Sequence, residues 1–278
     1  MYFEAFKIHE NFEIIQIFFR KLYEKLLEKK RTQEQVNNNE FEKFNNILEM
    51  FSQQEVKIIK NFIQSQDIGV KIQDGHLFIQ ISRFILEANK FLKVDISKLS
   101  RVLNWKGFEE IIAKICEENE YRVVKNFRFS DKSNFYHKTN QKRYEIDIIA
   151  ILNNHILLID AKHWNNKTNN YSSVNKASIL QKRRVQALEK NLEVSSNLIS
   201  SLFSAYKFKK IKSLLPFKLI PVVVTLNENK CKLSYGQVPI VSIFELNTFI
   251  QELSFNMNYF YFEQLNSLYI QKSLFEKY

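Results

Sequence analysis

The stretch YEIDIIAILNNHILLIDAK, residues 144–162, has the pattern of a β-hairpin. Two runs of β-branched and aliphatic residues flank Asn153 and Asn154, a pair that tolerates the positive φ of a tight turn. If these two asparagines form the turn, Leu152 faces His155, and every further cross-strand pair follows by counting outward. The register of the whole hairpin therefore follows from one turn.

This register brings charged side chains together at the end of the hairpin that lies away from the turn. Asp147 faces Asp160 across the two strands, and Glu145 faces Lys162. Because side chains alternate between the two faces of a strand, all four point to the same side of the sheet. The sequence therefore predicts two acids side by side, with a lysine one step away.

Two carboxylates at one point of an apolar sheet need a physical explanation. Like charges that face each other destabilise a sheet, and these strands are apolar on both faces, as in sheets that helices cover on both sides. Such carboxylates either share a proton or bind a cation. One or two carboxylates, with water and a substrate phosphate, are typical ligands of Mg²⁺. The alternative to a metal site is that Glu145 and Lys162 form a surface ion pair and that Asp147 and Asp160 only cap the ends of their strands.

The composition favours a folded protein with a polyanionic partner. Of the 278 residues, 45% are hydrophobic and 26% are charged, which excludes a disordered chain. The net charge is +11, with a pI near 9.4, which favours nucleic acid as the partner. The alternative is the amino-acid bias of an AT-rich genome. The two cysteines exclude a disulfide framework or a zinc site, and with only 4 Gly and 3 Pro we expect helices to dominate.

The N-terminal residues do not have the pattern of a signal peptide, because charged residues interrupt their apolar ones. No apolar run approaches the roughly 20 residues that a membrane-spanning helix needs. We therefore expect a cytoplasmic protein without a membrane partner.

Residues 1–100 are predicted to form a mainly helical region with one small hairpin. Amphipathic helices are expected at 4–30, at 40–64 and at 82–92, with the hairpin at 70–81. Helices followed by a small hairpin are consistent with a winged-helix-like reader of nucleic acid. They are equally consistent with packing or dimerisation structure, which the aromatic stripe favours.

From residue 101 to residue 278 the pattern changes to alternating helices and strands. A helix is expected near 107–119, and one long helix near 173–206. Strands other than the hairpin are expected at 121–129, 219–226 and 238–243, and closing helices at 245–253 and 258–275.

Two further polar side chains lie where they can extend the acidic pair. Glu109 stands at the edge of the apolar stripe of its helix, where it can reach a metal at a strand end or form a solvated flank. Gln181 lies in the inward line of the long helix, and a buried amide needs a hydrogen-bond partner. That partner is the lysine, a metal-bound water or a phosphate, or else a buried backbone group.

Basic residues on the same helix and after it are candidates for binding a phosphate backbone. The neighbours of Gln181 are predicted to face outward: Lys182, Arg183, Arg184 and Gln186. A second basic run contains Lys207, Lys209, Lys210 and Lys212, for which a solvated face is the alternative. Trp164 is a candidate for stacking on a base, or for core packing.

These residues follow one another in the order of a known superfamily: Phe108-Glu109 on a helix, Ile146-Asp147 and Asp160-Ala161-Lys162 on two strands, and Gln181 on the next helix. Over roughly residues 105–250 the chain resembles the PD-(D/E)xK phosphodiesterases, in particular Mrr-like and related archaeal restriction-like nucleases. The resemblance implies an α/β fold with a restriction-endonuclease-like core, in which helices flank a mixed central sheet. Residues 1–100 would then be a mainly helical N-terminal extension of a nuclease domain at 101–278.

The resemblance also implies roles for individual residues. The acids matched by Asp147 and Asp160 hold Mg²⁺, or Mn²⁺, and the glutamate matched by Glu109 helps to hold the metal or its water. The lysine matched by Lys162 orients or activates the attacking water. The chain departs from the motif at Ile146, where the superfamily often has proline, and at Asp160, where glutamate is common. The expected catalytic set is Glu109, Asp147, Asp160, Lys162 and Gln181.

The implied function is a Mg²⁺-dependent endonuclease that hydrolyses phosphodiester bonds, most often in DNA, in restriction, defence or repair. RNA or a branched junction is the weaker alternative as substrate. The alternative from another class is an inactive nucleic-acid-binding or assembly subunit that keeps the nuclease fold. Because nucleases of this fold often dimerise to cut both strands, a homodimer is also expected.

Overall fold

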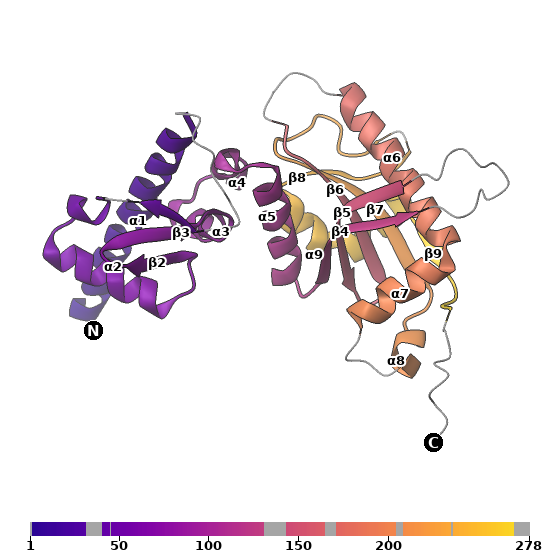
Figure 1. The fold of residues 1–278 in the computed structure, drawn as a ribbon, viewed down its shortest axis with the longest axis horizontal. Helices are drawn as coiled ribbons and strands as arrows, with labels where there is room; N and C mark the ends of the chain where they lie inside the picture. The colour runs from indigo at the N-terminus through magenta and orange to yellow at the C-terminus, as the bar shows by residue number, and fades with distance from the viewer. Residues whose placement is uncertain are drawn as a thin grey trace. The chain divides into compact units, whose positions relative to one another are not determined.

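A computed structural model describes residues 2–31, 41–44, 46–130, 143–164, 171–203, 208–234 and 236–269. The chain divides into two compact units, Met1–Ile111 and Ile112–Tyr278, which are described separately below (Figure 1). None of the described helices combines the length and the apolar character that crossing a membrane requires.

The first unit contains long helices and a three-stranded antiparallel sheet in the order β1-β3-β2. Its elements are α1 (Tyr2–Arg31), β1 (Phe41–Phe44), η1 (Leu48–Met50), α2 (Gln53–Ser65), β2 (Val70–Gln73), β3 (His76–Gln80), α3 (Ile81–Leu92), α4 (Ile96–Leu99) and η2 (Ser100–Val102). The predicted hairpin is confirmed: Asp74 and Gly75, both with positive φ, connect β2 to β3.

The predicted helix over residues 40–64 is wrong in its first half. Residues 41–44 pair with β3 as an edge strand, and α2 begins only at Gln53. Ser52 accepts a hydrogen bond from the backbone N–H of Glu55, and the Glu55 carboxylate accepts one from the backbone N–H of Ser52. This capping box determines where the helix begins, whereas the strand depends on pairing with a distant segment.

The second unit is built on a mixed six-stranded sheet within its described residues, in the order β4-β5-β6-β7-β8 with β9 beside β7. The strands are β4 (Arg122–Ser130), β5 (Arg143–Leu152), β6 (His155–Lys162), β7 (Phe217–Thr225), β8 (Ile240–Ser242) and β9 (Glu263–Leu265). β4, β5 and β6 are antiparallel, β6, β7 and β8 are parallel, and β9 runs antiparallel to β7.

Helices cover this sheet on both faces (Figure 1). They are α5 (Trp105–Glu118), which begins in the first unit, α6 (Tyr171–Lys190), α7 (Leu192–Leu202), α8 (Phe208–Lys212) and α9 (Leu246–Asn256), with the turn η3 (Met257–Tyr259). On the face that α6 and α7 cover, Val185 and Leu188 join Leu158 and Leu219 in one buried core. The α/β fold with a mixed sheet flanked by helices, and a helical N-terminal region, is as predicted.

The boundaries of three predicted elements differ from the structure for local reasons. The predicted helix over 173–206 is two helices, because the Asn191 side chain accepts a hydrogen bond from the backbone N–H of Val194 and starts α7. The strand predicted at 219–226 begins at Phe217 and ends at Thr225, so Pro221 lies inside β7. On the side of β7 that faces away from β6, β9 pairs with residues 217–219 and β8 pairs with residues 223–225. Pro221 lies between these two pairings, so the N–H that proline lacks is not needed for a hydrogen bond between strands. In place of the helix predicted over 258–275, residues up to 269 contain η3 and strand β9, and residues 270–275 lie outside the described residues.

Candidate active site at the open end of the hairpin

The β5–β6 hairpin has the predicted register. Its pairs run from Leu152 opposite His155 to Ile148 opposite Ile159, and Asn153 has a positive φ at the turn. Residues 148–151 and 156–161 of the two strands are all buried. Local turn chemistry thus positions the acids that lie beyond the last pair.

Beyond Ile148 the regular ladder ends, and the Asp147 side chain bridges to the second strand. Its Oδ2 accepts a hydrogen bond of 2.8 Å from the backbone N–H of Ala161. Burial raises the pKa of Asp147 above its ordinary value, and the nearby charge of Asp160 raises it further. The Ala161 N–H, Lys162 and Arg184 act in the opposite direction without cancelling this rise. Asp147 and Asp160 are therefore close enough to repel each other, as the register predicts.

Asp160 is the most deeply buried acid of the site, with 1% of its surface exposed. Arg184 Nη1 donates to Asp160 Oδ1 at 2.6 Å. Lys162 Nζ lies 2.8 Å from the other oxygen, Oδ2. The direction of that second contact does not meet hydrogen-bond geometry, so Oδ2 is a buried acceptor without a hydrogen bond among the described residues. We treat the Lys162 contact as an attraction between charges.

Gln181 of α6 is completely buried and connects the helix to the site. Its Nε2 donates to the backbone carbonyl of Leu158 at 2.6 Å, and its Oε1 accepts from Arg184 Nη1 at 2.8 Å. The inward position of Gln181 is confirmed, and of the predicted partners the structure shows the buried backbone carbonyl. Through Arg184, Gln181 also holds the carboxylate of Asp160.

The prediction that Arg184 faces outward is wrong. Its side chain is only 12% exposed and reaches Asp160. At three residues beyond Gln181 and next to the buried Val185, Arg184 stands on the flank of the inward face, and its long side chain reaches the carboxylate from there. Arg184 thus belongs to the site, and its spacing of three residues from the buried Gln181 is the sequence feature that indicates this.

Glu145 has a different partner from the one that the simple register suggests. It lies opposite Arg128 of β4, and Arg128 Nη2 donates to Glu145 Oε1 at 2.9 Å. The Arg128 side chain is largely exposed, and that of Glu145 is about half-exposed. Because the β5–β6 ladder stops at Ile148, the regular register does not extend to Glu145 and Lys162. The alternative of a Glu145–Lys162 surface pair therefore does not explain the lysine, which contacts Asp160.

Glu109 lies on α5 and is buried, with 8% of its surface exposed. Within the described part of the chain, no three His, Cys, Asp or Glu side chains gather as a group that could hold a metal ion. The part of Glu109 in the site stays a prediction. The pair formed by Asp147 and Asp160 is the acidic centre that the structure itself brings together.

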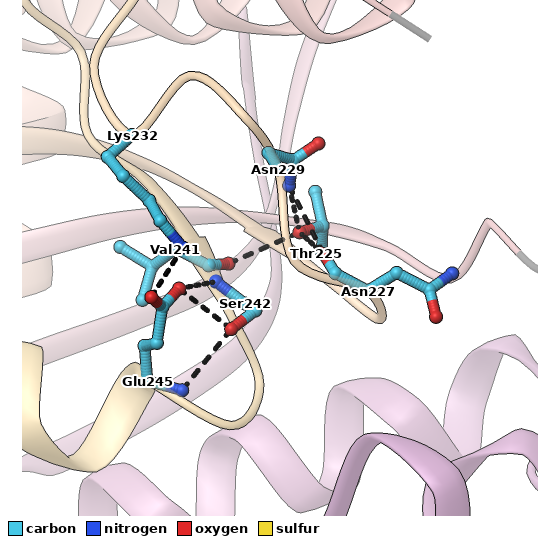
Figure 2. Close-up of polar contacts among 7 residues, drawn as sticks. All are labelled: Thr225, Asn227, Asn229, Lys232, Val241, Ser242 and Glu245. Carbon is cyan, nitrogen blue, oxygen red and sulfur yellow. Dashed lines mark hydrogen bonds and ion pairs between the residues drawn. The ribbon is translucent and has the colours of Figure 1, made fainter. Parts of the chain in front are cut away.

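A polar network lies at the ends of the parallel strands β7 and β8 (Figure 2). Lys162, Thr225 and Ser242 occupy neighbouring register positions on β6, β7 and β8. The Thr225 hydroxyl donates to the carbonyl of Asn227 at 2.8 Å, and Ser242 and Glu245 bond each other reciprocally ahead of α9. Thr225 and Ser242 are both buried. These hydrogen bonds satisfy their buried hydroxyl groups, so the two residues have a structural role at the ends of the strands.

The other residues that are predicted to contact nucleic acid differ in how exposed they are. Lys182 is half-buried, with its Nζ 3.7 Å from the centre of the Tyr261 ring. Arg183, Lys209 and Lys210 are exposed, whereas Lys207 lies outside the described residues. A role of these side chains in binding nucleic acid stays a prediction.

Comparison with known proteins identifies the same part of the chain. Residues 104–225 match the family model of the nuclease-related domain, NERD. An uncharacterised protein of Archaeoglobus fulgidus is 27% identical over 160 residues, which are 58% of this chain and 99% of that protein. A solved structure, protein VC1899 from Vibrio cholerae, aligns with 10% identity and a TM-score of 0.32 over 90% of this chain; the alignment spans about half, 53%, of that protein. The match to the nuclease-related domain at residues 104–225 falls within the segment over which the sequence resembles the PD-(D/E)xK phosphodiesterases.

Proposed function

We propose that this chain is a Mg²⁺-dependent endonuclease that cuts DNA, in restriction, defence or repair. One observation carries the proposal: two neighbouring carboxylates, Asp147 and Asp160, lie beside Lys162 within the nuclease-related domain. In the absence of a further cation this pair repels itself, and Asp160 Oδ2 has no hydrogen bond within the described chain. A divalent cation relieves both costs.

The donor set fits a hard divalent ion. Carboxylate oxygens are the ligands that Mg²⁺ and Mn²⁺ prefer, and Asp147 and Asp160 would hold the ion, with Glu109 as the third predicted ligand. When bound there, the ion would supply polarisation of the scissile phosphate and a lower pKa of its bound water.

Side chains around the acidic pair would position the reactants and the metal ligands. Lys162, 2.8 Å from Asp160, brings a positive charge to the place where the phosphate becomes more negative. It also orients the attacking water by donating hydrogen bonds. Arg184 and Gln181 hold Asp160 in one orientation from the side of α6. Such supporting contacts maintain the geometry of a metal ligand.

The charge distribution supports a polyanionic substrate for this domain. Residues 112–278 contain 24 Lys and Arg against 14 Asp and Glu, so they carry +10 of the net charge of +11. A concentrated positive charge attracts nucleic acid and accelerates its association. DNA is our choice of polymer, and RNA is the alternative that the first experiment distinguishes.

The direct test is a substrate panel with the purified chain. Supercoiled plasmid, single-stranded DNA, branched DNA and structured RNA are incubated with Mg²⁺, Mn²⁺ or EDTA. We expect DNA to be nicked or linearised only with the divalent ions. Cleavage of RNA alone would replace the substrate, and binding without cleavage under all conditions would favour the inactive nucleic-acid-binding subunit.

We expect replacement of Glu109 by Gln to lower cleavage by about 10- to 100-fold and to raise the Mg²⁺ concentration required. A neutral amide removes one negative charge from the predicted metal ligands while it keeps the shape of the side chain. Glu110→Gln, one residue further along α5, is the matched control and should leave the rate within about twofold. Equal rates of the two variants over a Mg²⁺ titration would remove Glu109 from the site.

We expect Asp147→Asn to stabilise the metal-free protein at pH 7 by roughly 1 kcal/mol. The pKa of Asp147 is raised in the folded state, so its ionisation at neutral pH opposes folding. The advantage of Asn should disappear as the pH falls below the ordinary aspartate pKa, because both side chains are then neutral. Urea unfolding in EDTA from pH 3 to pH 8 measures this. An Asn variant that is less stable at pH 7 would contradict the repulsion between the two acids.

A further inference from the structure

The exposed face of α2 in the first unit consists of amides and lysines. Six exposed residues contribute to it: Gln53, Gln54, Lys57, Lys60, Asn61 and Gln64. At 100° per residue they span an arc of about 120° around the helix. The one acid of the helix, Glu55, lies outside this arc and binds the backbone N–H of Ser52. We call these six residues the α2 face.

The absence of acids from the α2 face does not follow from the composition of the unit. Residues 1–111 contain 17 Lys and Arg and 16 Asp and Glu, so the unit is almost neutral. Two lysines and four amides nevertheless lie together on one helix surface, without an acid among them. This segregation gives the face a local positive charge, which complements a polyanion.

The fold presents the α2 face as a rigid surface. The opposite side of the helix buries Ile59 and Ile63, and the capping box at Ser52 determines where the helix begins. Apart from the short turn η1 that precedes α2, the elements follow in the order α1, β1, α2, β2, β3, and the sheet has the order β1-β3-β2. This order resembles that of a winged-helix domain, with the short turn η1 in the place of the first helix of the helix-turn-helix. In helix-turn-helix proteins the second helix enters the major groove of DNA.

The residue types of the α2 face match the edges of base pairs. Asn and Gln form paired hydrogen bonds with adenine in the major groove, and Lys binds guanine or phosphate. An α-helix is about 10–12 Å wide, and the major groove of B-form DNA is about 12 Å wide, whereas the deep groove of A-form RNA is too narrow. We propose that the α2 face binds duplex DNA in its major groove. The inference shares with the proposed function only the choice of DNA, and it does not depend on cleavage.

The test measures binding of the full chain in EDTA, where a metal-dependent nuclease does not cut. A fluorescent 30-base-pair duplex is titrated at several salt concentrations, and anisotropy reports the affinity. We expect Lys57→Gln with Lys60→Gln to weaken binding about tenfold or more at 150 mM salt, and to reduce the slope of log K against log salt concentration by about 2. The matched control is Lys43→Gln with Lys98→Gln, which removes two exposed lysines of the same unit outside the α2 face. Circular dichroism and melting temperature verify that all variants are folded.

A second double variant, Gln54→Ala with Asn61→Ala, distinguishes contacts to the bases from contacts to the phosphates. The amides carry no charge, so the slope of log K against log salt concentration should be the same as for the wild type. Because the amides contact bases, the affinities of this variant for different duplex sequences should differ less than those of the wild type. Affinities of the lysine variant equal to those of its control would overturn the inference, even where the chain cleaves DNA. Equal affinity of the wild type for duplex DNA and duplex RNA would also overturn groove binding. Loss of cleavage in active-site variants tests the proposed function alone.

Discussion

Replacing Asp160 by Asn should lower the rate of DNA cleavage by about 1,000-fold or more. Asp160 is 1% exposed and is contacted by Lys162 on one oxygen and Arg184 on the other. The amide has no negative charge to hold a divalent ion, and it leaves the two cations without their counter-charge. The measurement is the rate of plasmid nicking at saturating Mg²⁺, together with Mn²⁺ binding by calorimetry.

The matched control for this variant is Glu145→Gln. Glu145 belongs to the same hairpin, but its partner is the exposed Arg128 on the neighbouring strand β4. Surface ion pairs contribute little, so both stability and cleavage should stay near the wild-type values. If Asp160→Asn and Glu145→Gln cut DNA equally fast, the acidic pair is not the active site. If the Asn variant still binds Mn²⁺ with unchanged affinity, the metal lies elsewhere.

Replacing Arg184 by Met should destabilise the metal-free protein by about 3 kcal/mol. Arg184 donates to both Asp160 and Gln181 from a largely buried position, and Met keeps the apolar part of the side chain without the charge. The loss leaves a buried carboxylate with one cation fewer. Arg183→Met is the matched control, because Arg183 is the exposed neighbour on the same helix, and it should change the stability by less than about 0.5 kcal/mol.

Divalent metal distinguishes a positioning role of Arg184 from a merely structural one. A cation at Asp147 and Asp160 replaces the charge that the Met variant lacks, so Mn²⁺ should raise the melting temperature of Arg184→Met more than that of the wild type. Cleavage should fall by about 10- to 100-fold, since the orientation of Asp160 depends on this contact. An equal Mn²⁺ shift in both proteins would show that Arg184 acts on the fold and not on the site.

Much of the acidic centre could be predicted because its determinants are local. Two asparagines define a turn, strand alternation assigns faces, and Asp147 and Asp160 follow as neighbours. No long-range information enters that step. The inward position of Gln181 has the same origin, because helical periodicity alone assigns it to the buried line of α6.

Other features depend on segments that are far apart in the chain. Residues 41–44 look helical by composition, yet they form a strand because β3 offers an unpaired edge. Pro221 lies inside β7 only because two different neighbours cover the strand on either side of it. Neither environment is visible in the local pattern, because each is created by partner strands that lie 17 or more residues away in the chain.

By itself, the sequence determined the α/β class, the hairpin register and the meeting of two carboxylates beside a lysine. Turn geometry and side-chain periodicity act within a few residues, so they can be read from a single chain. Only the tertiary structure decided that Arg184 turns inward and pairs with Asp160, and that Glu145 pairs with Arg128. These partners depend on how α6 and β4 pack against the hairpin, and a long charged side chain on the flank of a helix reaches whichever opposite charge that packing brings near.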